Sequence, residues 1–392
     1  ILSEAKDLLS LSEAGIAPVP GSMQSCRMIP AALPPLYSRW LDDALGGSIP
    51  AETNATCDSC AMVIDGASDA PVADIGFNPK TKCCTFLPEL WNFLVGAVLL
   101  DDDPAAARGR ATVEARLDAG IAVTPLGLGR TTTYALLYAA GQADVFGHSE
   151  RMLCPHYLNE RGGLCGVWRH RESTCATWFC KYERGAVGQQ FWQRLHQLLQ
   201  AAEEALAAWA LLELNLDGSA LATVFRGRQV LRPTKLSSDD VDGVRDPLAL
   251  NSAWGSWRGR ERELYVKSAR LVASLTWSDV QRIGGAKLGV HERVARDSYA
   301  QLLDTAPPQR PDAALVQITP RGRNRARLAS YSPCDALDVP AVVAKVLPFF
   351  DGRPMADAIA EVHAREGVTI DPSLVRKLTD FGILRDAAAN PR

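Results

Sequence analysis

The sequence predicts a mostly α-helical protein with little β structure, in which helices flank an irregular cysteine-rich core and a small domain follows. Three observations predict this fold class. Apolar residues recur at three- and four-residue spacing over Gly188–Leu214, which indicates a long amphipathic helix. Residues 57–180 are irregular and rich in cysteine, glycine and aromatic residues. Beyond residue 312, an alternating stretch precedes three short helical segments, as expected for a winged-helix-like domain.

The chain divides into four segments in sequence order. A proline-rich lead-in covers residues 1–50, and a cysteine-rich domain that ends in the long helix covers residues 51–214. Helical and loop signals mix over residues 215–305. The prolines of Ala306–Asp312 predict a linker. The winged-helix-like domain then covers residues 313–387.

Further helices are predicted within these segments. A helical hairpin-like stretch covers Glu89–Ala119, and a second apolar run covers Thr131–Ala140. Residues 261–304 have a helical pattern again. In the C-terminal domain, a hairpin should lead into three helices, at Val339–Phe350, Met355–Glu366 and Pro372–Phe381.

Composition excludes several classes of protein. The chain has 392 residues, of which 47% are apolar and 22% charged, so it is an ordinary globular protein with a sizeable core. A net charge of −3 gives no general attraction for nucleic acid, which is therefore a disfavoured partner. The longest apolar run, Leu90–Leu100, is too short for a membrane span. The first residues lack the order of a signal peptide, so we expect a cytoplasmic location, where disulfides are rare.

Eight of the ten cysteines form two groups in the sequence. The first group joins a Cys-x-x-Cys loop to two adjacent cysteines, and the second spreads over residues 154–180. A Cys-x-x-Cys loop can turn two thiolates toward one point, and the lysines of "KTKCC" favour the thiolate form by lowering the thiol pKa. We therefore predict metal ligation, with disulfides and buried structural thiols as alternatives. The predicted ligands are Cys57, Cys60, Cys83, Cys84, Cys154, Cys165, Cys175 and Cys180.

The spacing of these cysteines bears on the kind of metal. Zinc modules usually pair a Cys-x-x-Cys loop with a second pair a short distance away, and both groups here are more widely spread. Adjacent cysteines with Trp168, Trp178 and Phe179 nearby favour a shielded iron–sulfur site, one or two clusters of the four-iron type, with zinc as the alternative. Spacing leaves open whether the eight thiols serve two clusters, one cluster and a zinc, or a single shared cluster.

No catalytic residue stands out in the sequence. His156 and His170 lie next to predicted ligands, where we expect them to support the site rather than to bind metal. The chain has no dinucleotide-binding glycine fingerprint, no radical-SAM cysteine motif and no nucleophile elbow. Enzymatic activity therefore stays open.

The cysteine pattern resembles a bacterial family. "CDSC", "KCC" and "CPHY…GGLCGVWRHRESTCATWFC" are similar to the YkgJ-like zinc- or iron-chelating domains over residues 54–185, and flagellin lysine N-methylases carry a similar cluster. The resemblance implies that the eight cysteines bind metal, but it implies no particular reaction. The chain departs from the family in the long insert between Cys60 and Cys83.

A second resemblance lies at the C-terminus. "VVAKVLPFFDGRPMADAIAEVHAREGVTIDPSLVRKLTDFGILR" is similar to PqqD-like peptide-recognition domains, with Asp351–Gly352 in the place of their turn and Leu378–Leu384 closing the fold. This resemblance implies a peptide or protein partner. We thus expect a redox or modifying protein that acts on such a partner. The alternatives are a non-catalytic metal-stabilised scaffold, and a cluster-sensing regulator, which the acidic Met355–Glu366 disfavours.

Overall fold

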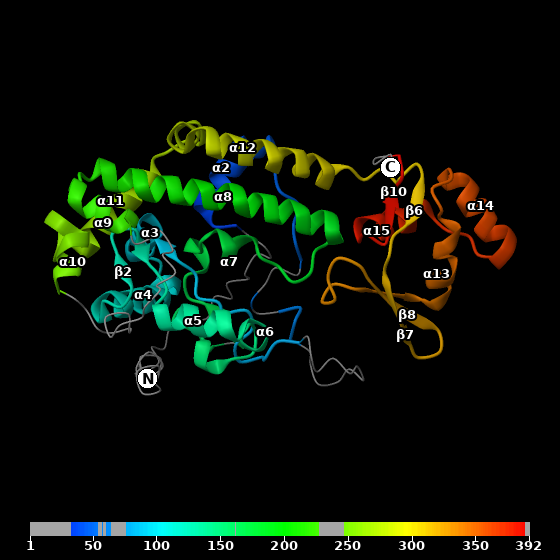
Figure 1. Ribbon diagram of the computed structural model, residues 1–392, viewed down its shortest axis with the longest axis horizontal. Helices are drawn as coiled ribbons and strands as arrows, with labels where there is room; N and C mark the ends of the chain where they lie inside the picture. Colours follow the sequence, from blue (N-terminus) through cyan, green and yellow to red (C-terminus); the bar gives the residue numbers. More distant parts are fainter. Residues whose placement is uncertain are drawn as a thin grey trace.

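Two long helices, α8 (Gly185–Glu213) and α12 (Trp277–Leu303), run side by side and antiparallel along the computed structural model of the protein (Figure 1). Helix α8 forms where the sequence predicts a helix, and its apolar stripe is buried. Helix α2 (Pro35–Leu45) lies against α12, and its Trp40 indole donates a hydrogen bond to the Leu275 carbonyl at 3.0 Å. The structure describes residues 33–53, 57, 60–63, 76–160, 162–226 and 247–388.

Helices α3 (Asn92–Leu100) and α11 (Glu261–Ala273) form the second close helix pair. A Cβ atom at Gly96 would lie 1.9 Å from the Tyr265 carbonyl oxygen, so only glycine permits this approach. The other helices of this region are α4 (Ala107–Ala119), α5 (Thr132–Ala140), α6 (Gln142–Val145), α7 (Ser173–Thr177), α9 (Gly218–Arg226) and α10 (Pro247–Trp254), with 3-10 turns η1 (Pro104–Ala106), η2 (Glu150–Met152), η3 (Trp168–His170) and η5 (Gly255–Trp257).

The strands beside these helices are very short. One antiparallel sheet has the order β1-β3-β2, and a separate hairpin pairs β4 with β5. The strands are β1 (Leu90–Trp91), β2 (Val123–Thr124), β3 (Gly127–Leu128), β4 (Tyr157–Leu158) and β5 (Leu164–Cys165). The described residues are therefore mostly helical with minor β structure, as predicted.

One hydrophobic core joins the first three segments of the sequence. Its buried members extend from Tyr37 on α2 to Leu302 on α12 and include Trp192 of α8 and Trp254 of α10. The described part of the proline-rich lead-in, from residue 33, is thus integral to this core. Residues 1–32 of the lead-in and residues 227–246 of the mixed segment lie outside the described residues.

The C-terminal domain has its own core, formed by residues such as Leu328, Phe350, Val362 and Leu378. A three-stranded antiparallel sheet of order β7-β8-β9 leads into three helices, and β6 pairs with β10. The elements are β6 (Pro311–Ala313), β7 (Gln317–Arg321), β8 (Arg325–Ala329), β9 (Leu337–Pro340), α13 (Ala341–Val346), η6 (Leu347–Phe349), α14 (Met355–Glu366), α15 (Pro372–Asp380) and β10 (Leu384–Asp386).

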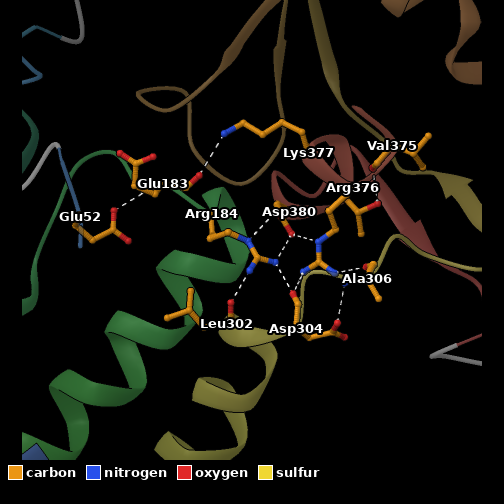
Figure 2. Close-up of polar contacts among 11 residues, drawn as sticks. Glu52, Glu183, Arg184, Leu302, Asp304, Ala306, Val375, Arg376, Lys377 and Asp380 are labelled. Atoms are coloured by element: carbon orange, nitrogen blue, oxygen red, sulfur yellow. Dashed lines mark hydrogen bonds and ion pairs between the residues drawn. The ribbon is translucent and has the colours of Figure 1, made fainter. Parts of the chain in front are cut away.

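Two arginines fasten this domain to the ends of α8 and α12. Arg184 contacts both carboxylate oxygens of the buried Asp380, at 2.6 and 2.8 Å, and also donates to the Leu302 and Asp304 carbonyls (Figure 2). Arg376 binds the same carboxylate and donates to the Asp304 and Ala306 carbonyls. The predicted linker at residues 306–312 is therefore held in place at its start.

Across the part of the chain that the structure describes, each helix is either too short or too polar to cross a bilayer.

Candidate metal centre

Backbone hydrogen bonds bring the two cysteine groups of the sequence into contact. The Cys154 amide donates to the Cys84 carbonyl at 2.7 Å, which ties the second group to the first. The β4–β5 hairpin pairs Tyr157 with Cys165, and the Tyr157 amide donates to the Cys154 carbonyl at 2.9 Å. Residues 84, 154 and 165 therefore lie together although they are distant in the sequence.

Lys82 makes the second link between the groups. Its backbone has a φ of 50°, which is uncommon outside glycine and turns the chain sharply before Cys83. Its buried ammonium donates to the Cys57 carbonyl and, at 3.0 Å, to the Gly163 carbonyl. One cation thus holds the Cys-x-x-Cys loop and the loop before Cys165 against the turn that carries the adjacent cysteines.

The thiol of Cys83 lies within electrostatic range of the other seven predicted ligands, since it affects the pKa of each. The Cys83 and Cys84 thiols are hydrogen-bonded, which lowers the pKa of Cys83 to about 7 and raises that of Cys84. For the other six, burial is the main cause of a raised pKa, and the nearby Cys83 thiol raises it further. These six are Cys57, Cys60, Cys154, Cys165, Cys175 and Cys180.

Two buried arginines bring positive charge to the thiols. Burial lowers the pKa of Arg171, while the Cys165, Cys57 and Cys175 thiols act in the opposite direction, in that order. Burial also lowers the pKa of Arg116, which the Cys154 thiol counteracts. A guanidinium keeps its charge in a protein, so these side chains favour ionised thiols around them.

Backbone amides reach several of the sulfurs. Hydrogen bonds from the Met62 and Val63 amides lower the pKa of Cys60 against the larger effect of burial. The amides of His156 and Val167 do the same for Cys154 and Cys165, again against burial. Amide donors to sulfur are a regular feature of thiolate metal sites.

The hydroxyl of Tyr157 faces the same thiols. Burial and then the Cys84, Cys57 and Cys83 thiols raise the pKa of Tyr157 to about 12. Its oxygen is buried and has no hydrogen-bond partner among the residues that the structure describes. A buried hydroxyl without a partner costs free energy, and a sulfur-rich group bound at the thiols would satisfy it.

The thiols, backbone amides and buried cations of this site are groups that suit a thiolate-bound metal group. In the structure, however, the thiols are not arranged around one common position. No set of three or more His, Cys, Asp or Glu side chains among the described residues is arranged to hold a metal ion as it stands. In this arrangement the Cys83 and Cys84 thiols are hydrogen-bonded to each other. Soft thiolates, amide donors and buried cations suit iron–sulfur clusters and zinc.

The two histidines beside the cysteines have other partners. His156 is fully buried, and its Nδ1 lies 2.8 Å from the Thr112 hydroxyl while Nε2 faces Arg116 at 3.4 Å. Burial lowers its pKa, so the ring is neutral. His170 Nε2 lies 2.8 Å from an Asp101 carboxylate oxygen. Both rings position the chain around the cysteines.

A buried glutamate beside the thiols was missed by the sequence reasoning. Glu203 of α8 accepts hydrogen bonds from the Tyr37 hydroxyl, the Trp91 indole at 3.2 Å, and the Ser173 amide and hydroxyl at 2.8 and 2.5 Å. Burial, followed by the neighbouring Glu172 carboxylate, raises the pKa of Glu203 to about 8. Glu172 caps α7 through the Thr174 and Cys175 amides. Glu203 thus anchors the helix that carries Cys175.

We expect Glu203→Gln to change how stability depends on pH. A carboxyl group whose pKa is raised from 4.5 to about 8 by folding stabilises the protein fully below pH 4.5, and this stabilisation is lost as the pH rises toward 8. Wild type should therefore lose stability relative to E203Q by up to about 1.4 kcal/mol per pH unit between pH 5 and 8. Urea unfolding at several pH values measures this difference.

Glu204→Gln is the matched control for this measurement, because Glu204 is the next residue on α8 and pairs with Lys287 at the surface. Parallel stability curves for wild type and E203Q across pH 5–8 would contradict the expected titration of Glu203.

Comparison with known proteins identifies no relative. No protein family model matches the chain, and neither a curated protein nor a solved structure does. The function is therefore argued from the residues of the site.

Proposed function

We propose that the protein binds iron–sulfur clusters through Cys57, Cys60, Cys83, Cys84, Cys154, Cys165, Cys175 and Cys180, and that it is a redox or modifying protein. The observation that supports this most is that buried or half-buried thiols from distant parts of the chain all lie within electrostatic range of Cys83. Structural thiols would need no such proximity, since a small apolar side chain can be buried singly.

The chain's own residues would prepare the thiols for the group. Arg171, Arg116 and Lys82 offset the negative charge of the thiolates, and the Met62, Val63 and Val167 amides donate to sulfur. Tyr157 would donate its hydroxyl proton in a hydrogen bond to a sulfur of the bound group. An iron–sulfur cluster supplies one-electron transfer when bound. Burial would keep water from the sulfurs and so protect the site from hydrolysis and oxidation.

A peptide or protein partner of the C-terminal domain is the second part of the proposal. Strand β7 lies at the edge of its sheet, with Ile318 47% exposed and the preceding Leu315 fully exposed. An exposed edge can accept an extended peptide as an added strand. The Tyr182 amide donates to Asp335 at 2.9 Å, so this domain contacts the chain directly after Cys180. Photocrosslinking from Ile318, with the exposed Val290 of α12 as control, tests this part.

The alternative is a zinc-stabilised scaffold, which one observation favours. A cleft of about 220 Å³ lies between α4, α10 and α11, and none of the eight cysteines lines it. A thiolate site that lies apart from the cleft would be typical of structural zinc, whose binding contributes directly to folding.

The metal content of anaerobically purified protein decides between these functions. We expect a broad absorption band at about 400 nm with about four or eight irons and matching sulfide per chain. Colourless protein with one or two zinc ions per chain would favour the scaffold. Protein purified and reconstituted without stable iron or zinc would overturn the proposal.

A further inference from the structure

Positive charge is concentrated on one hairpin of the C-terminal domain. Strands β7 and β8 with the turn between them contain four arginines and no acidic residue, although the whole chain has a net charge of −3. These arginines are Arg321, Arg323, Arg325 and Arg327. The tip of the hairpin projects away from α8 and α12 (Figure 1). The protein therefore has an exposed basic end on a chain that is slightly acidic overall.

The strand register places this charge on one face of the sheet. Arg321 lies directly opposite Arg325, and Arg327 lies opposite Asp338 of β9. Side chains that are opposite one another, or two residues apart on a strand, share a face. All three arginines therefore lie on the face that points away from the buried Leu328. Like charges directly opposite each other destabilise a hairpin, and a carboxylate from a partner would offset this repulsion.

Two of the four arginines could bind such a carboxylate. Arg327 is already bound to the Asp338 carboxylate at 2.8 and 3.0 Å, and Arg325 donates to the Asp338 carbonyl at 2.7 Å. Within the part of the chain that the structure describes, Arg321 and Arg323 make neither a hydrogen bond nor an ion pair. Acidic residues of a partner would therefore bind at these two positions.

The outer edge of β7 presents backbone groups beside this charge. Pro320 has no N–H, so we expect it to face away from β8, as prolines of edge strands do. Backbone groups of alternate residues point to the same side, so the Ile318 amide and carbonyl face outward too. The Ile318 side chain, 47% exposed, lies opposite Leu328 and therefore on the other face from Arg321. An added strand would place alternate side chains beside Ile318 and beside Arg321.

Helix α15 disfavours nucleic acid as the ligand of this hairpin. In helix-turn-helix proteins, a recognition helix enters the major groove of DNA. Here two basic residues of α15 already bind the rest of the chain: Arg376 donates to the Asp304 carbonyl at 2.6 Å, and Lys377 donates to the Glu183 carbonyl at 3.2 Å (Figure 2). With this helix packed against the ends of α8 and α12, the exposed strand edge favours a peptide.

We propose that the β7 edge binds an extended acidic segment of a protein partner, in which acidic residues alternate with apolar ones. The backbone of the segment would pair with β7, its apolar side chains would pack beside Ile318, and its carboxylates would pair with Arg321 and Arg323. This inference rests on the peptide partner proposed above for the C-terminal domain, and it specifies the chemistry of that partner.

Selection from a displayed library of random peptides tests this inference on the whole chain. Wild type should enrich peptides in which Asp or Glu alternates with apolar residues. A selected peptide should bind Arg321→Gln with Arg323→Gln about tenfold more weakly, and high salt should reduce this difference. The control, Arg353→Gln with Arg365→Gln, removes the same charge from other exposed positions of the domain and should bind as wild type does.

Peptides methylated at alternate backbone nitrogens test the pairing with β7. One of the two alternating patterns should abolish binding and the other should not, because only every second amide of an added strand faces β7. Binding that tolerates both patterns would overturn strand addition.

The same selection separates failure of this inference from failure of the proposed function. Enriched peptides that lack acidic residues, or that bind R321Q/R323Q as tightly as wild type, would overturn the acidic partner and leave a peptide partner in place. If no peptide is enriched, or if a DNA duplex binds more tightly than every selected peptide, the proposed peptide partner is overturned as well.

Discussion

Gly109→Ala is expected to destabilise the protein by about 3 kcal/mol or more. Gly109 lies on α4 against the chain that follows Cys165, and a Cβ atom there would be 1.7 Å from the Gly166 carbonyl oxygen. The Gly166 amide is itself bonded to the His156 carbonyl at 2.7 Å, so the hairpin cannot simply move aside. To avoid this overlap, α4 and the β4–β5 hairpin would have to move apart, and the movement would also displace Cys165. Urea unfolding and metal content measure both consequences.

Gly289→Ala is the control for this substitution. Gly289 lies within α12, and a Cβ atom there meets no other atom within 4 Å. Alanine should be neutral or stabilise by up to about 1 kcal/mol, because it favours the helix over the unfolded chain. Equal stability of G109A and G289A would show that α4 and the hairpin are not in the contact described above.

Arg184→Met should weaken the attachment of the C-terminal domain and cost about 3 kcal/mol. The substitution leaves Arg376 as an ionic partner of the buried Asp380. It removes the Arg184 donors to the Leu302 and Asp304 carbonyls at the end of α12, although Arg376 still donates to the Asp304 carbonyl (Figure 2). Methionine keeps much of the length of the side chain but donates no hydrogen bond. We expect two unfolding transitions in place of one, and faster proteolysis at residues 304–312.

Arg353→Met tests whether loss of any arginine–aspartate pair has this effect. Arg353 pairs with Asp351 in similar geometry, but both side chains are far more exposed than those of Arg184 and Asp380. Exposed pairs contribute about 0–1 kcal/mol, so this variant should retain wild-type behaviour. If R184M unfolds in a single transition at the wild-type midpoint, the clamp between the domains does not contribute to stability.

The helices with clear terminal signals could be predicted from the sequence. The predicted bounds of α14, Met355–Glu366, are those observed, because Pro354 precedes the helix and Gly367 ends it with a φ of 66°. The stretch 261–304, which has a helical pattern in the sequence, contains two helices. α11 ends at Ala273, and Thr276 and Asp279 form a capping box that begins α12. That Thr-x-x-Asp signal is present in the sequence and could have located the break.

The candidate site was predictable as a set of residue types but not as an arrangement. The eight cysteines stand out in the sequence because cysteine is so frequent there. Which residues surround them in the fold depends on the positive φ of Lys82, which no sequence pattern predicts. The buried position of Glu203 could have been predicted from the sequence. It lies four residues after Leu199 and three before Leu206, both fully buried, so a charged residue interrupts the apolar stripe of α8.

The shared core has a consequence for how the chain is made on the ribosome. Tyr37 and Trp40 near one end of the described chain are covered only when α8 and the start of α12 are available, since they contact Glu203 and the Leu275 carbonyl. At about 5–20 residues per second, synthesis proceeds for several seconds between Cys180 and Leu275. During that interval every cysteine from Cys57 to Cys180 is already synthesised, yet the helices that enclose them are incomplete. The nascent chain therefore exposes its thiols to solvent before it can shield them.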